Sequence, residues 1–459
     1  MPVNFPRRMF LGSGFALGAG AFPGLVRASD PPARVLRAVT ARHSLVGEGY
    51  PPTEVWSYDG KIPGPVLNYR QGERLRITFE NHLPEASTVH FHGIRLPNAM
   101  DGVPHLTQAP VEPGAKFQYE FDLPDAGTYW YHPHLGSAEQ VGRGLSGALI
   151  VQEHAPPAVD RELLWVLSDW RLDREARIVP NFGNFMDASH AGRIGNTVSV
   201  NGSVPESIDV NPGERLRLRL VNASNARIYG LNFQGHDPVV IAYDGHPVAP
   251  HRPERGRVVL GPAMRADLIL DLAGESGRNY PVVDDYYPRL AYRLLDLRYS
   301  KNTRAGRAGS ALQPLAPNPV AEPVLERAER HQIVFGGGMM GSMPRQPAAR
   351  GMIWTVNGQP VHEHDAKPIL SLELGRTALI ELVNDTMWPH PIHLHGHVFR
   401  VVSRDGSPTA HREWRDTVLL EARQRAEIAF VADNPGVWML HCHVLEHQAS
   451  GMMAAIRVA

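Results

Sequence analysis

Short runs of alternating apolar and polar residues, bounded by Gly, Pro, Asn and Asp, make up most of the chain, and stretches of helical period are few. Alternation with a period of two is typical of strands that bury one face. Three such runs, at 75–79, 216–220 and 378–382, each have a Gly before them and an Asn after them. The Gly and the Asn are nine residues apart in all three: Gly72 and Asn81, Gly213 and Asn222, and Gly375 and Asn384. A repeat of this length predicts three β-sandwich domains in a row and not a solenoid.

The repeat also sets the expected domain boundaries. We predict domains at 32–155, 156–305 and 326–459, with a linker at 306–325 between the second and the third. The chain around this linker is rich in Pro, Ala and Arg, which is typical of a connecting segment.

The first 28 residues predict an export signal. A short basic start with Arg7 and Arg8 is followed by an apolar stretch, and Ala28 gives the small-residue end of a cleavage site. The Arg-Arg-Met-Phe-Leu sequence resembles a twin-arginine signal, which implies a bacterial periplasm. Because the apolar stretch is short and broken by Gly and Pro, we expect no membrane anchor in the mature chain.

The amino-acid composition excludes some classes of function. With 46 Lys+Arg against 47 Asp+Glu in 459 residues, the chain has no basic surplus, so no nucleic-acid partner is expected. Cys442 is the single cysteine, which excludes an internal disulfide. A lone thiol in an oxidising compartment favours a metal ligand over a bystander. Histidine is the unusual residue, with 23 copies.

Eight of these histidines form four His-x-His pairs that are related by the repeat. Nine and eleven residues after the Asn, the first and third copies have histidines, whereas the middle copy has Leu231 and Phe233. A second pair lies five and seven residues after a Gly in the same two copies. The pairs are His90 and His92, His132 and His134, His393 and His395, and His441 and His443. Residues i and i+2 project from one face of a strand, so four two-pronged clamps can enclose a cluster where the first and third domains meet.

This donor set favours copper. A structural zinc site takes four ligands and a catalytic one takes three plus water, so eight histidines in register fit several metals better. Imidazoles without a carboxylate suit copper.

Cys442 predicts a second kind of site. It lies between His441 and His443 and therefore points away from the face that they serve. His390, His447 and Met452 are its candidate partners, since two His, one Cys thiolate and a weak axial Met form an electron-transfer copper site. Because Met453 adjoins Met452, a packing role for either methionine stays open. In the first domain the position between the two histidines is Pro133, which can bind no metal, so one electron-accepting copper is expected.

With these four motifs in order, the whole mature chain resembles a three-domain multicopper oxidase. The resemblance implies an all-β fold of three consecutive cupredoxin-like Greek-key domains, the middle one without copper, and four copper ions. It implies type 1 copper on His390, Cys442, His447 and Met452, type 2 copper on His90 and His393, and a type 3 pair on His92, His132, His134, His395, His441 and His443. The family couples four one-electron oxidations of a small-molecule reductant to the reduction of O2 to water. A monomer is expected.

Protons must also reach the oxygen site. The resemblance matches Asp101 to an acidic residue that family members use for proton transfer. An Asp-Gly turn explains the same residue equally well. Glu446 is a second candidate proton donor. After His447 many bacterial members carry Glu, whereas this chain has Gln448. An amide cannot donate a proton as a carboxylic acid does, so we expect Gln448→Glu to raise turnover.

The sequence leaves the reductant open. We expect laccase-like oxidation of phenols, and the alternative is a periplasmic cuprous oxidase that confers copper tolerance. Met339, Met340 and Met343, in a Gly-rich segment, supply the thioethers that such an oxidase would use for Cu(I), but they also fit flexible packing. Copper storage without turnover and a copper-free structural relative are the remaining alternatives.

Overall fold

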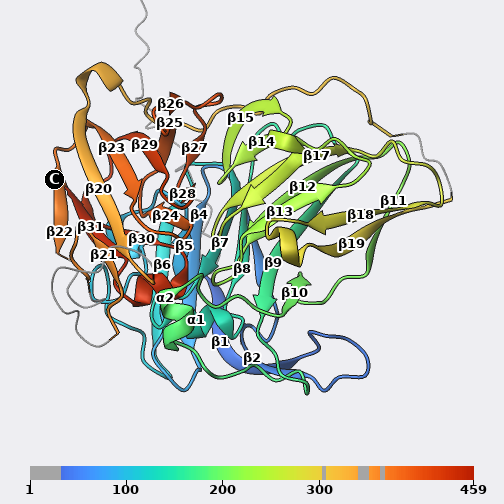
Figure 1. Ribbon diagram of the computed structural model, residues 1–459, viewed down its shortest axis with the longest axis horizontal. Helices are drawn as coiled ribbons and strands as arrows, with labels where there is room; N and C mark the ends of the chain where they lie inside the picture. Colours follow the sequence, from blue (N-terminus) through green and yellow to red (C-terminus); the bar gives the residue numbers. More distant parts are fainter. Residues whose placement is uncertain (1–32, 302–305, 340–350, 362–366) are drawn as a thin grey trace, which may run out of the picture. The chain divides into compact units, whose positions relative to one another are not determined.

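Two β-sheets recur in each of three successive repeats, coloured blue to teal, green to yellow and orange to red in Figure 1. We describe the protein from a computed structural model that places residues 33–301, 306–339, 351–361 and 367–459. The predicted export signal, 1–28, and the residues Met340 and Met343 lie outside these described residues. Residues Arg34–Ala459 form one compact unit, and the site lies inside it.

Each repeat pairs two sheets of antiparallel and parallel strands. The first repeat contains β1 (Arg34–His43), β2 (Thr53–Tyr58), β3 (Gly64–Arg70), β4 (Arg74–Asn81), β5 (His90–His92), β6 (Lys116–Asp122), β7 (Gly127–His132) and β8 (Gly147–Gln152), in the orders β2-β1-β4-β6 and β3-β8-β7-β5.

The middle repeat contains β9 (Arg161–Trp170), β10 (Thr197–Val200), β11 (Ser207–Val210), β12 (Arg215–Asn222), β13 (Tyr229–Phe233), β14 (Val239–Tyr243), β15 (His246–His251), β16 (Arg257–Leu260), β17 (Arg265–Asp271), β18 (Asn279–Asp284) and β19 (Tyr292–Tyr299). Their orders are β10-β9-β12-β17-β14-β15 and β11-β19-β18-β13-β16.

The third repeat contains β20 (Glu329–Gly337), β21 (Trp354–Val356), β22 (Pro368–Leu372), β23 (Thr377–Asn384), β24 (His390–Leu394), β25 (Phe399–Arg404), β26 (Ser407–Pro408), β27 (Trp414–Arg415), β28 (Thr417–Leu420), β29 (Arg425–Val431), β30 (Gly436–Cys442) and β31 (Met453–Val458). Their orders are β21-β20-β23-β29-β25-β26, with β27 beside β25, and β22-β31-β30-β24-β28.

The three runs that the alternation predicts are the equivalent strands β4, β12 and β23. Each runs parallel to the first strand of its repeat, and antiparallel to β6, β17 or β29 on its other side. The prediction of a mostly β chain built from a repeated unit is therefore confirmed.

The Asn that ends each of these strands makes the same hydrogen bonds in all three repeats. Its Oδ1 accepts from the backbone N–H two residues on, at 3.0 Å in each case. Its Nδ2 donates to a carbonyl of the same turn and to a carbonyl across the repeat, which is that of Val111, Leu260 or Leu420. The spacing seen in the sequence thus reflects a turn that a side-chain amide closes.

The middle repeat differs in how its central strand is covered. In β4 buried and partly exposed residues alternate, whereas every residue of β12 is buried, including Arg217 and Arg219. These guanidinium groups lie against the first repeat, where Arg217 pairs with Glu153 and Arg219 Nη1 donates to Thr128 Oγ1. These two polar positions therefore face the first repeat and not water.

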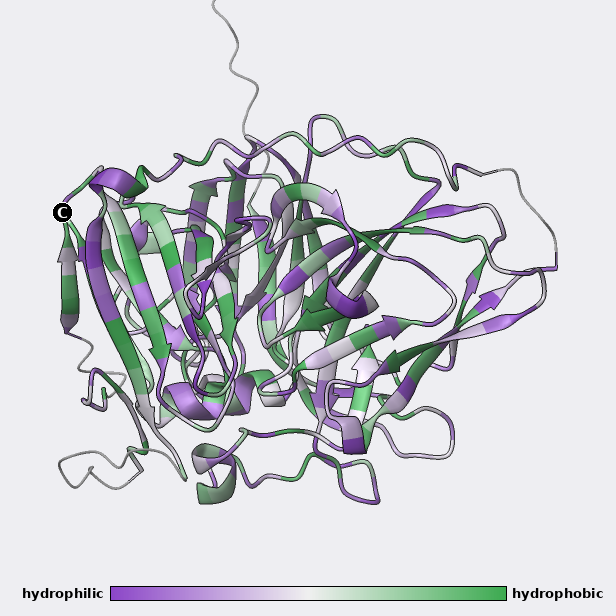
Figure 2. Ribbon diagram, turned by 45° about the horizontal axis from the view of Figure 1, so that its top comes forward, coloured by the Kyte–Doolittle hydropathy of each residue, from purple (hydrophilic) through white to green (hydrophobic). Residues whose placement is uncertain are grey.

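Three short helices, one from each repeat, pack together: α1 (Ser137–Gly142) and α2 (Phe185–Ser189) both contact α3 (Leu445–Ala449). Along many strands hydrophobic and hydrophilic bands alternate (Figure 2), and the hydrophobic positions form the cores between paired sheets. Within the described residues, no helix is long and apolar enough to cross a membrane.

Candidate metal centre

The eight paired histidines lie on, or directly after, equivalent strand pairs of the first and third repeats. In the first repeat His90 on β5 lies opposite His132 on β7, and in the third repeat His393 on β24 lies opposite His441 on β30. All eight side chains are buried. In the middle repeat the equivalent strand β13 places Leu231 and Phe233 in the hydrophobic core.

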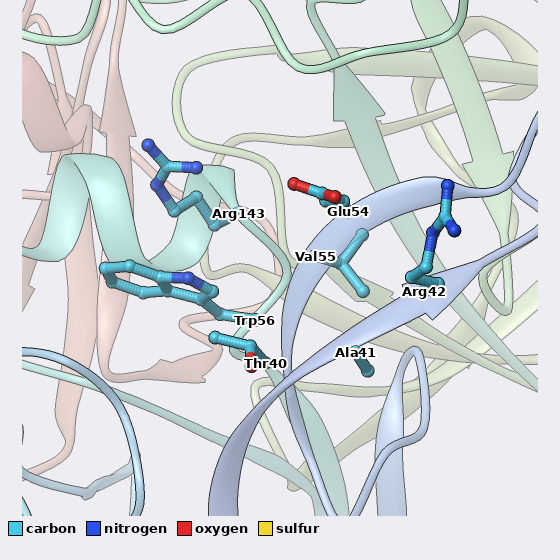
Figure 3. A pocket seen from close by; sticks show the side chains of 7 residues that line it. All are labelled: Thr40, Ala41, Arg42, Glu54, Val55, Trp56 and Arg143. Atoms are coloured by element: carbon cyan, nitrogen blue, oxygen red, sulfur yellow. The ribbon is translucent and has the colours of Figure 1, made fainter.

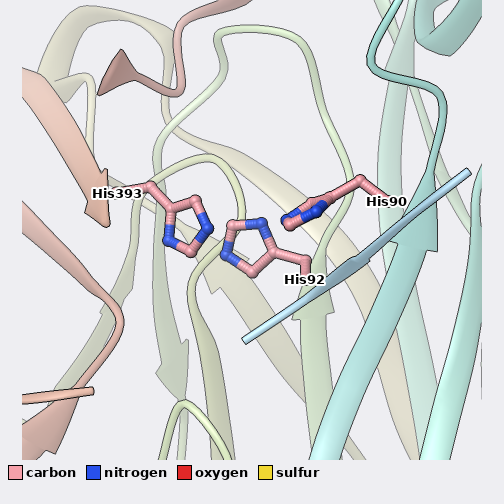
Figure 4. A group of neighbouring side chains, drawn as sticks. All are labelled: His90, His92 and His393. Atoms are coloured by element: carbon pink, nitrogen blue, oxygen red, sulfur yellow. The ribbon is translucent and has the colours of Figure 1, made fainter. Parts of the chain in front are cut away.

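The structure brings the eight histidines together between the first and third repeats. Side chains of both repeats contribute to each of three groups, whose candidate ligand atoms all lie within 4.8 Å of one another. These groups are His90, His92 and His393; His92, His132 and His443; and His134, His395 and His441. Figure 4 shows the first group, in which His90 and His92 of β5 meet His393 from the facing strand β24.

Buried nitrogen atoms without partners show that these residues fit a metal. Among the described residues, His90 Nε2, His92 Nδ1, His393 Nε2, His443 Nδ1 and both nitrogens of His134 have no hydrogen-bond partner. In His90 and His393 the opposite nitrogen is held by a backbone carbonyl. His90 Nδ1 lies 2.7 Å from the Asp101 carbonyl and His393 Nδ1 lies 2.8 Å from the Asp416 carbonyl. Such second partners fix the imidazole and leave the other nitrogen to a metal.

Burial also keeps these imidazoles in the form that binds metals. It holds the pKa of six of them well below the usual range and lowers the pKa of His393 as well; the six are His92, His132, His134, His395, His441 and His443. A neutral imidazole offers a lone pair, so the centre is prepared for a cation.

Cys442, at the end of β30, forms a second cluster with His390 and His447. Its Sγ lies 3.4 Å from His390 Nδ1 and 3.7 Å from His447 Nδ1, and the two nitrogens are 3.1 Å apart. Both Nε2 atoms point away, toward Thr386 Oγ1 at 2.8 Å and the His190 carbonyl at 2.7 Å. The sulfur of Cys442 and one nitrogen of each histidine are thus close enough together to bind a single metal ion.

The electrostatics of this cluster fit a bound cation. Burial holds the pKa of His390 well below its usual range and lowers the pKa of His447 to about 3. Burial raises the pKa of the Cys442 thiol, so a metal must displace its proton. Met452 is fully buried beside the cluster, since its carbonyl accepts from the Cys442 N–H at 3.1 Å.

The two predicted proton donors have different surroundings. Asp101 lies in the centre, with Oδ2 2.9 Å from His395 Nδ1. Glu446, on α3, accepts instead from the Arg193 N–H and from Asn225 Nδ2 of the middle repeat, each at 3.1 Å. Burial raises the pKa of Glu446. A proton-donating role for Glu446 stays a prediction.

Two buried residues that the sequence analysis did not single out contact the centre. Asp416 Oδ1 lies 3.0 Å from His92 Nε2, and Arg265 of the middle repeat donates to both oxygens of this carboxylate. Burial alone would raise the pKa of Asp416, but the Arg265 guanidinium holds it well below its usual range. No spacing connects these residues, because they lie in different repeats and outside the repeated positions.

Comparison with known proteins identifies the family. Models described as multicopper oxidase match residues 40–156, 161–299 and 338–459. The chain is 30% identical to the multicopper oxidase MmcO of Mycobacterium tuberculosis, over 98% of this chain and 96% of that protein. The chain belongs to the multicopper oxidase family.

Solved structures of multicopper oxidases have the same fold. The enzyme of Pseudomonas thermotolerans is 38% identical, with a TM-score of 0.84 over 93% of this chain and 99% of that one. A laccase-like multicopper oxidase of the lignin-degrading bacterium Ochrobactrum sp. is 25% identical, with a TM-score of 0.77 over 93% and 97% of the two chains. This multicopper oxidase is therefore an all-β oxidoreductase of three cupredoxin-like domains, from a family that binds copper and uses O2.

An open groove of about 390 Å³ lies on the first repeat, apart from the candidate ligands (Figure 3). It is lined by residues of β1 and β2 and by Arg143, whose guanidinium lies 5.0 Å from the Trp56 ring. None of the twelve predicted copper ligands lines this groove, so it does not mark the metal centre.

Proposed function

We propose that this multicopper oxidase oxidises phenolic substrates one electron at a time and reduces O2 to water. His390, Cys442, His447 and Met452 would hold type 1 copper, His90 and His393 type 2 copper, and the six remaining histidines the type 3 pair. Copper, when bound, supplies the one-electron redox chemistry. The observation that carries the proposal is the place of Cys442 on β30: its sulfur faces one cluster, and its chain neighbours His441 and His443 face the other.

The residues that surround His447 suit an aromatic reductant. The His447 imidazole is buried, and its Nε2 meets the carbonyl of His190, just after α2. Trp354 packs against His447, with ring centroids 4.2 Å apart, and its Nε1 donates to the Ala188 carbonyl. Phe185 and Met186 of the same helix are exposed. The helix α2, which covers His447 and Trp354, thus carries exposed apolar side chains that favour phenols, and the laccase-like relative from Ochrobactrum supports the same class.

For proton delivery the chain offers Asp101. Its carboxylate lies against His395 Nδ1, and its Oδ1 has no hydrogen-bond partner among the described residues. We propose that Asp101 passes protons to the oxygen-reducing centre, since a buried carboxyl group with a free oxygen can exchange a proton with a bound reactant.

A second candidate function is the oxidation of Cu(I). Met339 and Met387 are each 44% exposed, and Trp388, the neighbour of Met387, donates its indole N–H to the Met339 carbonyl. Trp388 precedes the ligand His390 by two residues. Exposed thioethers at this place could receive a soft monovalent cation.

We further propose that the protein is exported to the periplasm through the twin-arginine signal at 1–28 and acts there as a monomer. Its domains would be those expected from the sequence, at 32–155, 156–305 and 326–459. The Arg-Arg motif and the cofactor-dependent site together support export in the folded state.

O2 uptake by the copper-loaded protein tests the function. We expect four coppers per chain and a higher kcat/KM for dimethoxyphenol than for Cu(I), unchanged in a Met339→Leu, Met387→Leu double variant. Met100→Leu, in the first repeat, is the control. A preference for Cu(I) that the double variant removes would assign the second function. Bound copper without O2 uptake would indicate storage.

A further inference from the structure

The middle repeat supplies no histidine to the centre, but one of its side chains reaches it. Arg265 is the first residue of β17 and is fully buried. Its five N–H groups meet five acceptors: the carbonyls of Thr128, Ala263 and Asp244 and the two carboxylate oxygens of Asp416. An arginine has five donors in a rigid fork, so this site uses all of them, and a lysine could not replace it.

Through Asp416 this arginine acts on two histidines that come from the other two repeats. The Asp416 Oδ1 that accepts from Arg265 Nη1 at 2.8 Å also lies 3.0 Å from His92 Nε2. The Asp416 carbonyl accepts from His393 Nδ1 at 2.8 Å. The rings of His92 and His393 stack, with centroids 3.7 Å apart. The Thr417 hydroxyl lies 3.1 Å from His92 Nε2 and 3.3 Å from His393 Nδ1, so Asp416 and Thr417 together set which nitrogen each ring turns inward.

The chain makes room for this pair beside the first His-x-His motif. Gly93 follows His92, and a Cβ atom at this position would overlap Asp416 Oδ2 and Arg265 Nη2. The backbone of β5 can therefore approach the ion pair only because residue 93 has no side chain.

Asp101 is the counterpart of Asp416, and the comparison isolates what Arg265 adds. The Asp101 carbonyl accepts from His90 Nδ1 at 2.7 Å, and its Oδ2 lies 2.9 Å from His395 Nδ1. Each aspartate thus holds one histidine of its own repeat through its carbonyl and one of the other repeat through its carboxylate. Among the described residues Asp101 forms no ion pair with an arginine or lysine, and its Oδ1 lacks a hydrogen-bond partner.

We propose that Arg265 is a positioning residue of the shared copper centre: by fixing Asp416 it makes His92, held by the carboxylate, present Nδ1 to the metals, and His393, held by the carbonyl of the same residue, present Nε2. The middle repeat would then serve as the support that holds the first and third repeats in register around the coppers. The inference rests on the copper ligands proposed above.

Arg265→Lys in the copper-loaded protein tests this role, because it keeps the charge and removes the fork. We expect an unchanged type 1 absorption, an altered type 2 copper signal in electron paramagnetic resonance, and copper lost from the shared centre to a chelator about 10- to 100-fold more readily. Asp416→Asn, which keeps the shape of the side chain, should give the same altered signal, and it serves as the second variant if Arg265→Lys does not fold.

Arg219→Lys is the matched control. Arg219 is an equally buried arginine on the neighbouring strand β12, and it pairs with Asp267 and Glu162 without touching the histidine centre. If Arg265→Lys keeps the wild-type signal and copper retention, or if Arg219→Lys loses both to the same degree, the inference is wrong. Wild-type protein that binds no copper at the shared centre would instead refute the proposed function.

Discussion

The first and third repeats and the middle repeat share one architecture but use the same strand differently. On β5, and on β24 and directly after it, the side chains at the repeated positions are paired histidines, and several of their buried nitrogens have no hydrogen-bond partner among the described residues. On β13 the same positions hold Leu231 and Phe233, which pack in the core. Unpaired buried polar groups cost stability, so the outer repeats are built for a ligand that satisfies them, whereas the middle repeat needs no ligand at these positions.

The largest effect should come from removing the sulfur that distinguishes the third repeat from the first. Cys442→Ser should abolish the type 1 absorption and all oxidation of phenols while the shared centre keeps its copper. The variant then resembles the first repeat, where Pro133 occupies the equivalent place. Visible absorption, copper content and O2 uptake measure the three properties. Phenol oxidation at a rate near that of the wild type would contradict the assigned role of Cys442.

Replacing one histidine of the first repeat by an apolar residue should have opposite effects on the copper-free and the copper-loaded protein. Both nitrogens of His134 are buried without a partner among the described residues. His134→Leu should therefore raise the free energy of unfolding of the copper-free protein by about 1–3 kcal/mol, and lower copper binding at the shared centre. Denaturant unfolding of both forms measures this. A copper-free variant less stable than the wild type would contradict this and show that the His134 imidazole stabilises the protein without a metal.

The same histidines make the copper-free protein sensitive to acid. Because burial lowers their pKa, the unfolded chain binds more protons than the folded one below the ordinary histidine pKa of about 6.5. Stability should thus fall as the pH decreases from about 6.5, by up to about 1.4 kcal/mol per pH unit for each such histidine. Urea unfolding at several pH values tests this, and His134→Leu should show a shallower slope. A slope equal to that of the wild type would be inconsistent with a depressed pKa of His134.

The smallest effect concerns Gln448 on α3, in the third repeat. Its side chain is buried and its Oε1 has no partner among the described residues. Gln448→Glu would add a carboxyl group directly after the ligand His447, and we expect a modest rise in kcat for O2 reduction. Stopped-flow or oxygen-electrode assays at equal copper content measure it. An unchanged or lower kcat would leave Asp101 as the better candidate.

Repetition explains how much of the molecule the sequence could predict. The strands β4, β12 and β23 and the paired histidines recur at fixed distances from an Asn, and that Asn closes the same turn each time. The clustering of the eight histidines also follows from two equivalent strand pairs. Local periodicity therefore carries both the fold and the candidate ligands.

Contacts between repeats could not be predicted in this way. Arg265 and Asp416 are 151 residues apart, and His447 meets the carbonyl of His190 from 257 residues away. The alternation along β12 is typical of a strand that buries one face, but docking of the first repeat buries Arg217 and Arg219 on the other face as well. Such contacts depend on how the three repeats dock, and the spacing of residues along the chain does not predict that arrangement.

The five acceptors of Arg265 have a consequence for unfolding. One belongs to the first repeat, two to the middle repeat and two to the third. Opening any single repeat would deprive the buried Arg265 guanidinium of part of its hydrogen bonds, and this costs free energy. The three repeats should therefore melt in one cooperative transition, and the slowest-exchanging amides of β5, β17 and β28 should exchange together.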